Sequence, residues 1–105
     1  MINIRFIKQQ GLLEGFEMKG HSGYAEHGSD IVCAAVSSAA YMTANCVTEI
    51  IGIPAEISVD DGYMMMKLTS HDAMKAQDIL RGFELHINEL SQQYQINIKV
   101  NYSEV

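Results

Sequence analysis

Two hydrophobic periods alternate along the chain, and their order restricts the possible folds more than any other feature. Four short segments have an apolar residue at every second position, as strands do: residues 2–6, 57–59, 63–68 and 96–102. Residues 12–18 continue the extended pattern of the first segment, with Glu14 among the apolar positions. In residues 31–51 and 73–94 the apolar positions recur every three or four residues, as in helices. The predicted order is ββαββαβ. These elements close one core most simply as an α+β two-layer sandwich, with both helices on one face of a five-stranded, mostly antiparallel or mixed sheet.

Turn and cap residues support these boundaries. Asp61-Gly62 is a strong signal for a two-residue hairpin. Pro54 prevents the first helix from continuing toward the second hairpin. Thr69 and Asp72 have the spacing of a capping box just before the second helix. These three boundaries therefore have residues suited to their places.

Length and composition fit a single folded domain over residues 1–105. A chain of this size buries roughly two-thirds of the surface that its unfolded form exposes, which is enough for one core. Hydrophobic residues make up 48% and charged residues 19%, and this balance excludes a disordered scaffold. No linker or internal repeat divides the sequence.

The charge balance limits the partners. A formal net charge of -6 opposes binding to phosphate backbones, so we expect no direct nucleic-acid partner. It would favour a basic polypeptide, although modest acidity is also the common solubilising state of cytosolic proteins. The longest uninterrupted apolar runs are far below the ~20 residues that span a bilayer, and the N-terminus lacks a secretory segment. We therefore expect no membrane partner and a cytoplasmic location.

Cys33 is the candidate reactive group. It falls in the first turn of the first helix, after an irregular loop over residues 20–29 that contains three glycines and two histidines. Unpaired amides and the positive end of the helix dipole favour the thiolate at such a position. An imidazole within reach could take the thiol proton and later protonate a leaving amine, as acyl transfer requires. The alternative is that Cys33 is only a small buried hydrophobe, as most unpaired cysteines are.

The four histidines differ in how well they could serve as the base. His21 follows Gly20 at the end of the second strand, where a rigid scaffold can hold it, whereas His27 lies inside the glycine-rich loop. His71 and His86 belong to the second helical segment, where solvated side chains are expected. His21 is the preferred candidate.

Asp30 has two competing interpretations. As the N-cap of the first helix it would accept hydrogen bonds from the amides of Val32 or Cys33 and contribute ~1 kcal/mol of stability. It could instead orient His21 or a substrate amide. The cap is preferred, because a carboxylate this close to Cys33 disfavours the thiolate.

The second cysteine, Cys46, is predicted to pack rather than react. It lies in the same helix as Cys33, where 13 residues give ~20 Å of rise, far more than the ~7 Å that a disulfide spans between Cα atoms. The two thiols should stay free, as suits a reducing compartment.

Neither a metal nor a nucleotide explains the loop. His21, His27, Asp30 and Cys33 are metal-ligand types, but their spacing matches no paired ligand motif. The loop glycines do not space as a dinucleotide-binding fingerprint, and no P-loop lysine follows them. We expect no cofactor and no metal.

Gly20-His21, followed by the run Gly-Ser-Asp-Ile-Val-Cys-Ala-Ala-Val-Ser over residues 28–37, resembles the signature of the bacterial ribosomal-processing cysteine proteases. The likeness extends over the whole chain in length and order of elements. It implies a cytoplasmic, homodimeric endopeptidase that removes a short N-terminal extension from a large-subunit ribosomal protein.

The resemblance also implies roles for single residues. The family's catalytic histidine and cysteine fall on His21 and Cys33. The resemblance assigns no role to Asp30, which stays a candidate supporting residue on its position alone. The loop between the second strand and the first helix is expected to move over bound substrate; its candidate residues are Gly20, Ser22, Gly23, Tyr24, Gly28 and Ser29. Ser22 stands where alanine is more often expected. The alternatives from other classes are a dimeric binding module without catalysis and a redox-sensing thiol protein.

Overall fold

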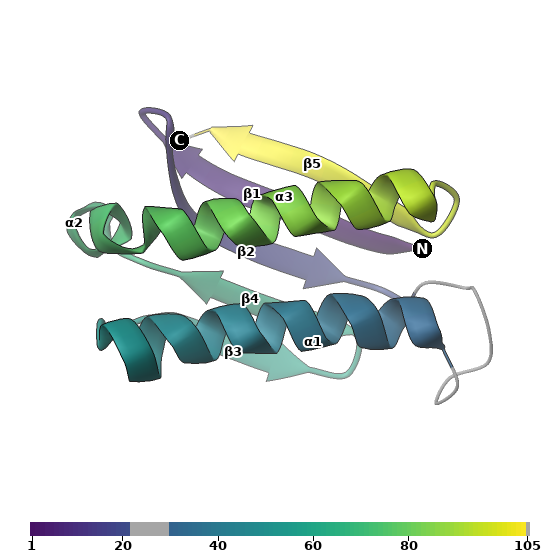
Figure 1. Ribbon diagram of the computed structural model, residues 1–105, viewed down its shortest axis with the longest axis horizontal. Coiled ribbons are helices and arrows are strands. Elements are labelled where there is room, and N and C mark those ends of the chain that lie inside the picture. Colours follow the sequence, from purple (N-terminus) through teal and green to yellow (C-terminus); the bar gives the residue numbers. More distant parts are fainter. Residues whose placement is uncertain (22–29, 105) are drawn as a thin grey trace.

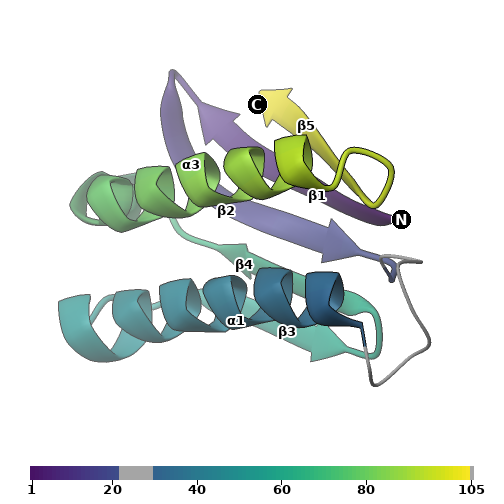
Figure 2. The ribbon, with the colours of Figure 1, turned by 45° about the vertical axis from the view of Figure 1, so that its right-hand side comes forward.

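The computed structural model describes residues 1–21 and 30–104. Five strands form one sheet, and the two long helices lie side by side on one of its faces (Figures 1 and 2). The strands are β1 (Ile2–Gln9), β2 (Leu12–Lys19), β3 (Glu56–Asp60), β4 (Tyr63–Lys67) and β5 (Ile98–Glu104). The long helices are α1 (Ile31–Asn45) and α3 (Gln77–Gln93). This arrangement confirms the predicted α+β two-layer sandwich.

The sheet is mixed, in the order β3-β4-β2-β1-β5. β1 and β2 form an antiparallel hairpin around Gln10 and Gly11, whose φ angles of 51° and 80° suit a tight hairpin turn. β4 pairs antiparallel with β2 on one side and with β3 on the other. β5 runs parallel to β1, because α3 carries the chain back to the end of the sheet at which β1 begins. β3 and β5 are thus the two edge strands of the sheet.

The core fills the space between the sheet and the helices. Phe83 of α3 packs its ring 5.8 Å from that of Phe6 and 4.6 Å from that of Phe16, so the helix is centred over β1 and β2. The inner side of α1 contributes Val32, Val36, Ala40, Thr43 and Ala44, all buried. The predicted apolar stripe of α1 is therefore the surface that meets the sheet.

The end of the first helical segment differs from the prediction. After Asn45 the helix widens into a π-helical stretch, η1 (Cys46–Ile51), which ends at Gly52 with a φ of 80°. A π turn holds more residues than an α turn, so the three-and-four spacing no longer keeps one face inward. Ile50, which the α-helical stripe would bury, is therefore 80% exposed.

The second helical segment and the last strand also depart from the predicted ranges. The segment starts as a short helix, α2 (Ser70–Ala73), capped by Thr69, whose side chain accepts from the amide of Asp72 at 3.2 Å as the capping box predicts. One 3-10 turn, η2 (Met74–Ala76), then separates α2 from α3. Ile96 is 83% exposed in the turn before β5, so the prediction that the strand begins there is wrong. The apolar alternation of residues 96–102 therefore begins inside the turn. The amides of Asn97 and Ile98 donate to the Tyr94 carbonyl, and these hydrogen bonds form the turn between α3 and β5.

Among residues 1–21 and 30–104, one helical stretch meets the length and composition criteria for a membrane span. Residues Ile31–Ile51 form 21 helical residues with a mean hydropathy of 1.4 in their most apolar window. The length of uninterrupted apolar runs in the sequence does not identify this stretch, because serine and threonine residues interrupt it. The inner face of the stretch packs into the core against the sheet, as in a helix of a two-layer sandwich.

Replacement of two glycines by alanine is expected to change stability in opposite directions. A side-chain carbon on Gly15 of β2 would overlap the carbonyl oxygen of Met66 in the neighbouring strand, whereas one on Gly82 of α3 would meet no atom within 4 Å. We expect Gly15→Ala to lower the free energy of unfolding by about 3 kcal/mol through overpacking. Gly82→Ala should raise it by about 1 kcal/mol, because alanine favours the helix. Urea denaturation of both variants tests this pair, and a neutral Gly15→Ala would contradict the packing of β2 on β4.

Candidate active site

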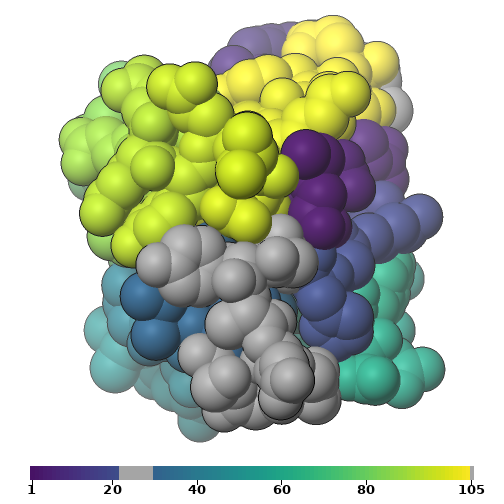
Figure 3. Space-filling model, turned by 90° about the vertical axis from the view of Figure 1, so that its right-hand side faces the viewer, coloured from purple at the N-terminus to yellow at the C-terminus, as the bar shows by residue number. Residues whose placement is uncertain are grey.

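A cleft opens at the end of the sandwich where α1 begins, β2 ends and the turn between β3 and β4 lies. Figure 3 views the molecule from this end, where the start of β1 lies beside the end of β2. The volume of the cleft is about 210 Å³. The residues that line it come from all of these elements and from the start of β1: Ile2, Met18, Gly20, His21, Cys33, Val36, Ser37, Tyr41, Asp60, Asp61, Gly62, Tyr63 and Met64. His21 and Cys33 therefore face one space.

Cys33 is held by the first turn of α1. Its side chain is half-buried and packs against the core on one side while it lines the cleft on the other. The interior does not seal it. Both cysteines are free, as their predicted separation along the helix requires.

Asp30 is the N-cap of α1, which confirms that interpretation. Its carboxylate accepts from the amides of Val32 and Cys33, each at 3.0 Å. The amide of Ala34 donates to the Asp30 carbonyl at 3.1 Å. The amides of residues 32–34 are thus occupied within the helix cap, and a carboxylate lies beside the backbone of Cys33.

This cap changes the expected use of the helix end. Backbone amides around Cys33 could stabilise the oxyanion of a tetrahedral intermediate only if Asp30 did not already occupy them. The amides of Val32, Cys33 and Ala34 already have acceptors, so that condition is not met in this arrangement. An oxyanion in the cleft needs a different donor, or a cap that opens.

Substitution of Asp30 separates its capping role from its charge. Asp30→Ala removes both hydrogen bonds to the α1 amides, and we expect the free energy of unfolding to fall by about 1 kcal/mol. Asn caps helices about as well as Asp, so Asp30→Asn should keep the stability while it removes a negative charge beside Cys33. Thermal unfolding measures the first effect, and the rate of Cys33 alkylation, expected to rise in Asp30→Asn, measures the second. Equal stability of the Ala and Asn variants would contradict the cap.

His21 is positioned by its neighbours at the end of β2. Gly20 has a φ of +96°, and its amide donates to the Gly62 carbonyl at 2.8 Å. A side-chain carbon on Gly62 would lie 3.0 Å from Nε2 of His21, so the imidazole ring lies against the β3–β4 turn. A larger residue at position 62 would push the ring away by a few tenths of an ångström. The histidine is exposed, as a base that serves an external substrate must be.

A polar network on the outer face of the sheet fixes the start of β4 beside His21. The hydroxyl of Tyr63 donates to Glu17 at 2.9 Å, and Arg5 donates to the other oxygen of that carboxylate at 3.0 Å. Burial would raise the pKa of Glu17, but the hydrogen bonds from Tyr63 and Arg5 outweigh it and hold that pKa below its ordinary value. The same bond to Glu17 raises the pKa of Tyr63. The turn that carries Gly62 is thereby tied to β2 and β1.

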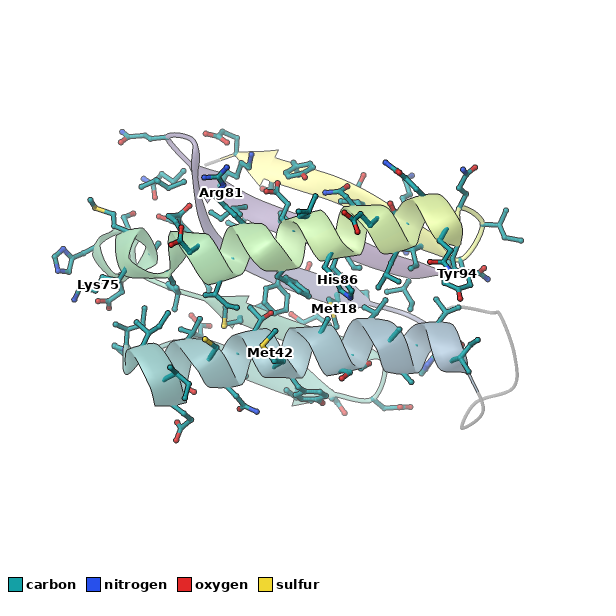
Figure 4. All side chains as sticks on the ribbon, viewed as in Figure 1. Met18, Met42, Lys75, Arg81, His86 and Tyr94 are labelled. Atoms are coloured by element: carbon teal, nitrogen blue, oxygen red, sulfur yellow. The ribbon has the colours of Figure 1, made fainter. Side chains whose placement is uncertain are left out.

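The other predicted residues lie away from this cleft or outside the described part of the chain. Ser22, Gly23, Tyr24, His27, Gly28 and Ser29 fall in residues 22–29, which the structure does not describe. Cys46 is half-buried in η1. His71 is exposed on α2, and His86 is exposed beside Met42 in a groove between α1 and α3 (Figure 4).

Sequence reasoning missed several residues that line the cleft. Ser37 and Tyr41 follow Cys33 at intervals of four, so they lie on the same side of α1, and this spacing was a usable signal. The turn residues Asp60, Asp61 and Gly62 had no such signal. They are distant in sequence, and the pairing of β4 with β2 brings them to the end of the sheet.

Comparison with known proteins assigns the family. The family described as Cysteine protease Prp matches residues 1–99. A Bacillus subtilis protein named Ribosomal processing cysteine protease Prp is 32% identical over 103 residues, covering 92% of this chain and 91% of that protein. A Staphylococcus aureus protein of the same name is 26% identical over 98 residues, covering 91% and 92%.

Solved structures agree with that assignment. The S. aureus protease Prp with a covalently linked product peptide superimposes with a TM-score of 0.90 at 26% identity, covering 98% of this chain and 100% of that one. A Streptococcus mutans protein gives a TM-score of 0.86 at 32% identity, covering 100% and 96%. This chain therefore belongs to the Prp family of cysteine proteases.

Proposed function

We propose that this protein is an endopeptidase that removes an N-terminal extension from a large-subunit ribosomal protein, with Cys33 as nucleophile and His21 as general base. The observation that carries this proposal is that the two side chains line one cleft, the cysteine in the first turn of α1 and the imidazole after the end of β2, against the β3–β4 turn. The names of the B. subtilis and S. aureus relatives supply the ribosomal substrate class.

The reaction follows the chemistry of these two groups. His21 takes the thiol proton, and the Cys33 sulfur forms a bond to the carbonyl carbon of the scissile peptide. The imidazolium then gives this proton to the leaving amine as the C–N bond breaks, which leaves a thioester. His21 next takes a proton from water, whose oxygen attacks the thioester and releases the acid product. The proton returns to sulfur, and the enzyme is restored.

Charge favours the approach of a ribosomal substrate. The chain has a formal net charge of -6, and Asp60 and Asp61 line the cleft, whereas ribosomal proteins are basic. Complementary charge mainly accelerates encounter and is screened by salt. Capture of a basic substrate should therefore slow as the salt concentration rises.

The direct test is cleavage of a peptide that spans the extension and its junction in the host's ribosomal protein. Mass spectrometry should find two products from a single cut at the junction. A protein that binds the peptide without cutting it would be the binding module instead. Reversible oxidation of Cys33 without any cleavage would identify a redox-sensing thiol.

We also propose that the enzyme is a cytoplasmic homodimer. The outer side of α1 leaves Ile31 and Met42 each 56% exposed, and such apolar surface is typical of a face that another subunit covers. Sedimentation at micromolar concentration should show twice the monomer mass of 11.7 kDa. A purely monomeric boundary at that concentration would reject the dimer.

A further inference from the structure

Strand β3 forms one edge of the sheet and leads into the cleft. It pairs with β4 alone, so within residues 1–21 and 30–104 no strand covers its other side. Its last residue, Asp60, lines the cleft together with Cys33 and Tyr41. A peptide held at Cys33 therefore lies at the end of an uncovered strand edge. β5, at the opposite edge, contributes no residue to the cleft.

Two hydrogen bonds determine which backbone groups of β3 face outward. The amide of Gly20 donates to the Gly62 carbonyl at one end of β4, and the amide of Leu68 donates to the Glu14 carbonyl at the other, each at 2.8 Å. Successive residues of a strand direct their N–H and C=O groups to opposite sides. The even-numbered residues of β4 therefore bond to β2, and its odd-numbered residues face β3.

The register transfers this pattern to β3. The odd-numbered residues of β4 pair with Glu56, Ser58 and Asp60. Ile57 and Val59 lie between these bonded positions, so their N–H and C=O groups point to the free edge. Two donors and two acceptors are thus presented at the spacing that an added strand requires.

The side chains of the same two residues provide an apolar surface beside that edge. Ile57 and Val59 pair with Met66 and Met64, which are buried beneath the helices, so all four side chains are on the helix side of the sheet. Ile57 is nevertheless 42% exposed and Val59 50% exposed. α1 runs along β3 in both views of the ribbon (Figures 1 and 2), and its Tyr41, 45% exposed, continues the apolar surface to the cleft.

We propose that the substrate binds as an additional strand on the free edge of β3, hydrogen-bonded to Ile57 and Val59. The segment it fits is extended, with an apolar side chain at every second position packed against Ile57, Val59 and Tyr41. The occupant is the substrate itself, because the edge is continuous with the cleft that contains Cys33 and His21. This inference rests on the proposed protease function and adds how the substrate is held.

The first test replaces one amide at a time by an ester along the peptide substrate. An ester removes a single donor and leaves the side chains unchanged. Where the removed N–H bonds to β3, we expect kcat/KM to fall about three- to tenfold, which is the usual net value of one hydrogen bond. Esters at the intervening positions serve as matched controls and should change it less than twofold. A uniform response along the peptide would overturn strand addition, whereas no cleavage of the all-amide peptide would instead reject the protease function.

The second test changes the enzyme. Val59→Pro removes an outward N–H and leaves every β3–β4 bond in place, and proline is tolerated at such edge positions. KM for the long peptide should rise about three- to tenfold, with an unchanged rate on a short ester substrate that reaches only the cleft. Equal losses on both substrates, or no loss on either, would contradict the proposal. If the variant fails to fold, the ester series on the unaltered enzyme decides the question.

Discussion

Cys33→Ala is expected to abolish peptide cleavage, with a loss of about a million-fold in kcat, as for removal of the nucleophile in other covalent proteases. The sulfur forms the bond to the substrate carbonyl, and nothing else in the cleft can take its place without a new mechanism. The substitution deletes one half-buried atom at the cleft, so the fold should be retained. The measurement is product formation over hours by mass spectrometry, with circular dichroism to show that the variant is folded.

Cys46→Ala is the matched control for this experiment. It removes the other thiol, also half-buried and within the same helical stretch, but in η1 rather than at the cleft. Cleavage should stay within about twofold of the unaltered enzyme, since substitutions outside functional features are usually small in effect. Equal activity of Cys33→Ala and the unaltered enzyme, or equal losses in Cys33→Ala and Cys46→Ala, would reject Cys33 as nucleophile.

The sequence predicted the parts of the fold that depend on local patterns. The apolar stripes of α1 and α3, the Asp61-Gly62 turn, the Thr69 cap and the Asp30 cap all appear where local rules place them. These features depend on residues within a few positions of one another, so a single sequence contains them. The position of Cys33 at the helix start follows from the same local rules.

Features that depend on tertiary contacts were beyond such rules. The π-helical end of the first helix turns Ile50 outward, although its spacing fits the stripe. The contribution of Asp60 and Gly62 to the cleft comes from the pairing of β4 with β2, which local patterns do not specify. The sequence left two interpretations of Asp30 open, and the structure shows that its carboxylate accepts from the amides of Val32 and Cys33 as the helix cap.

The β3–β4 turn links the positioning of His21 to the binding of substrate. Gly62 lies against the imidazole, and its carbonyl accepts a hydrogen bond from the Gly20 amide. Asp60 and Asp61, which precede Gly62, connect this turn to β3 and its proposed substrate-binding edge. A substrate strand bound along β3 would therefore lie on the strand that leads into the turn beside the base. The Tyr63–Glu17–Arg5 network ties this turn to the rigid centre of the sheet, so the positioning does not depend on substrate alone.

His21→Ala is expected to lower kcat by about a hundredfold to ten-thousandfold, the usual contribution of a general base. The cysteine remains, but its proton must go to water, and the leaving amine loses its proton donor. Because the side chain is exposed at the cleft, its removal leaves a space open to solvent. Added imidazole should therefore restore part of the activity in a concentration-dependent manner. A merely structural histidine would not be rescued in this way.

His86→Ala is the matched control, since that histidine is also exposed but lies in the groove between α1 and α3. It should cleave normally and show no response to imidazole. Alkylation of Cys33 by iodoacetamide near neutral pH gives an independent readout, because a base that takes the thiol proton increases the reactive thiolate. The labelling rate should fall in His21→Ala and stay unchanged in His86→Ala. If labelling and cleavage both survive the loss of His21, a group other than His21 deprotonates Cys33, and the proposed pair is wrong.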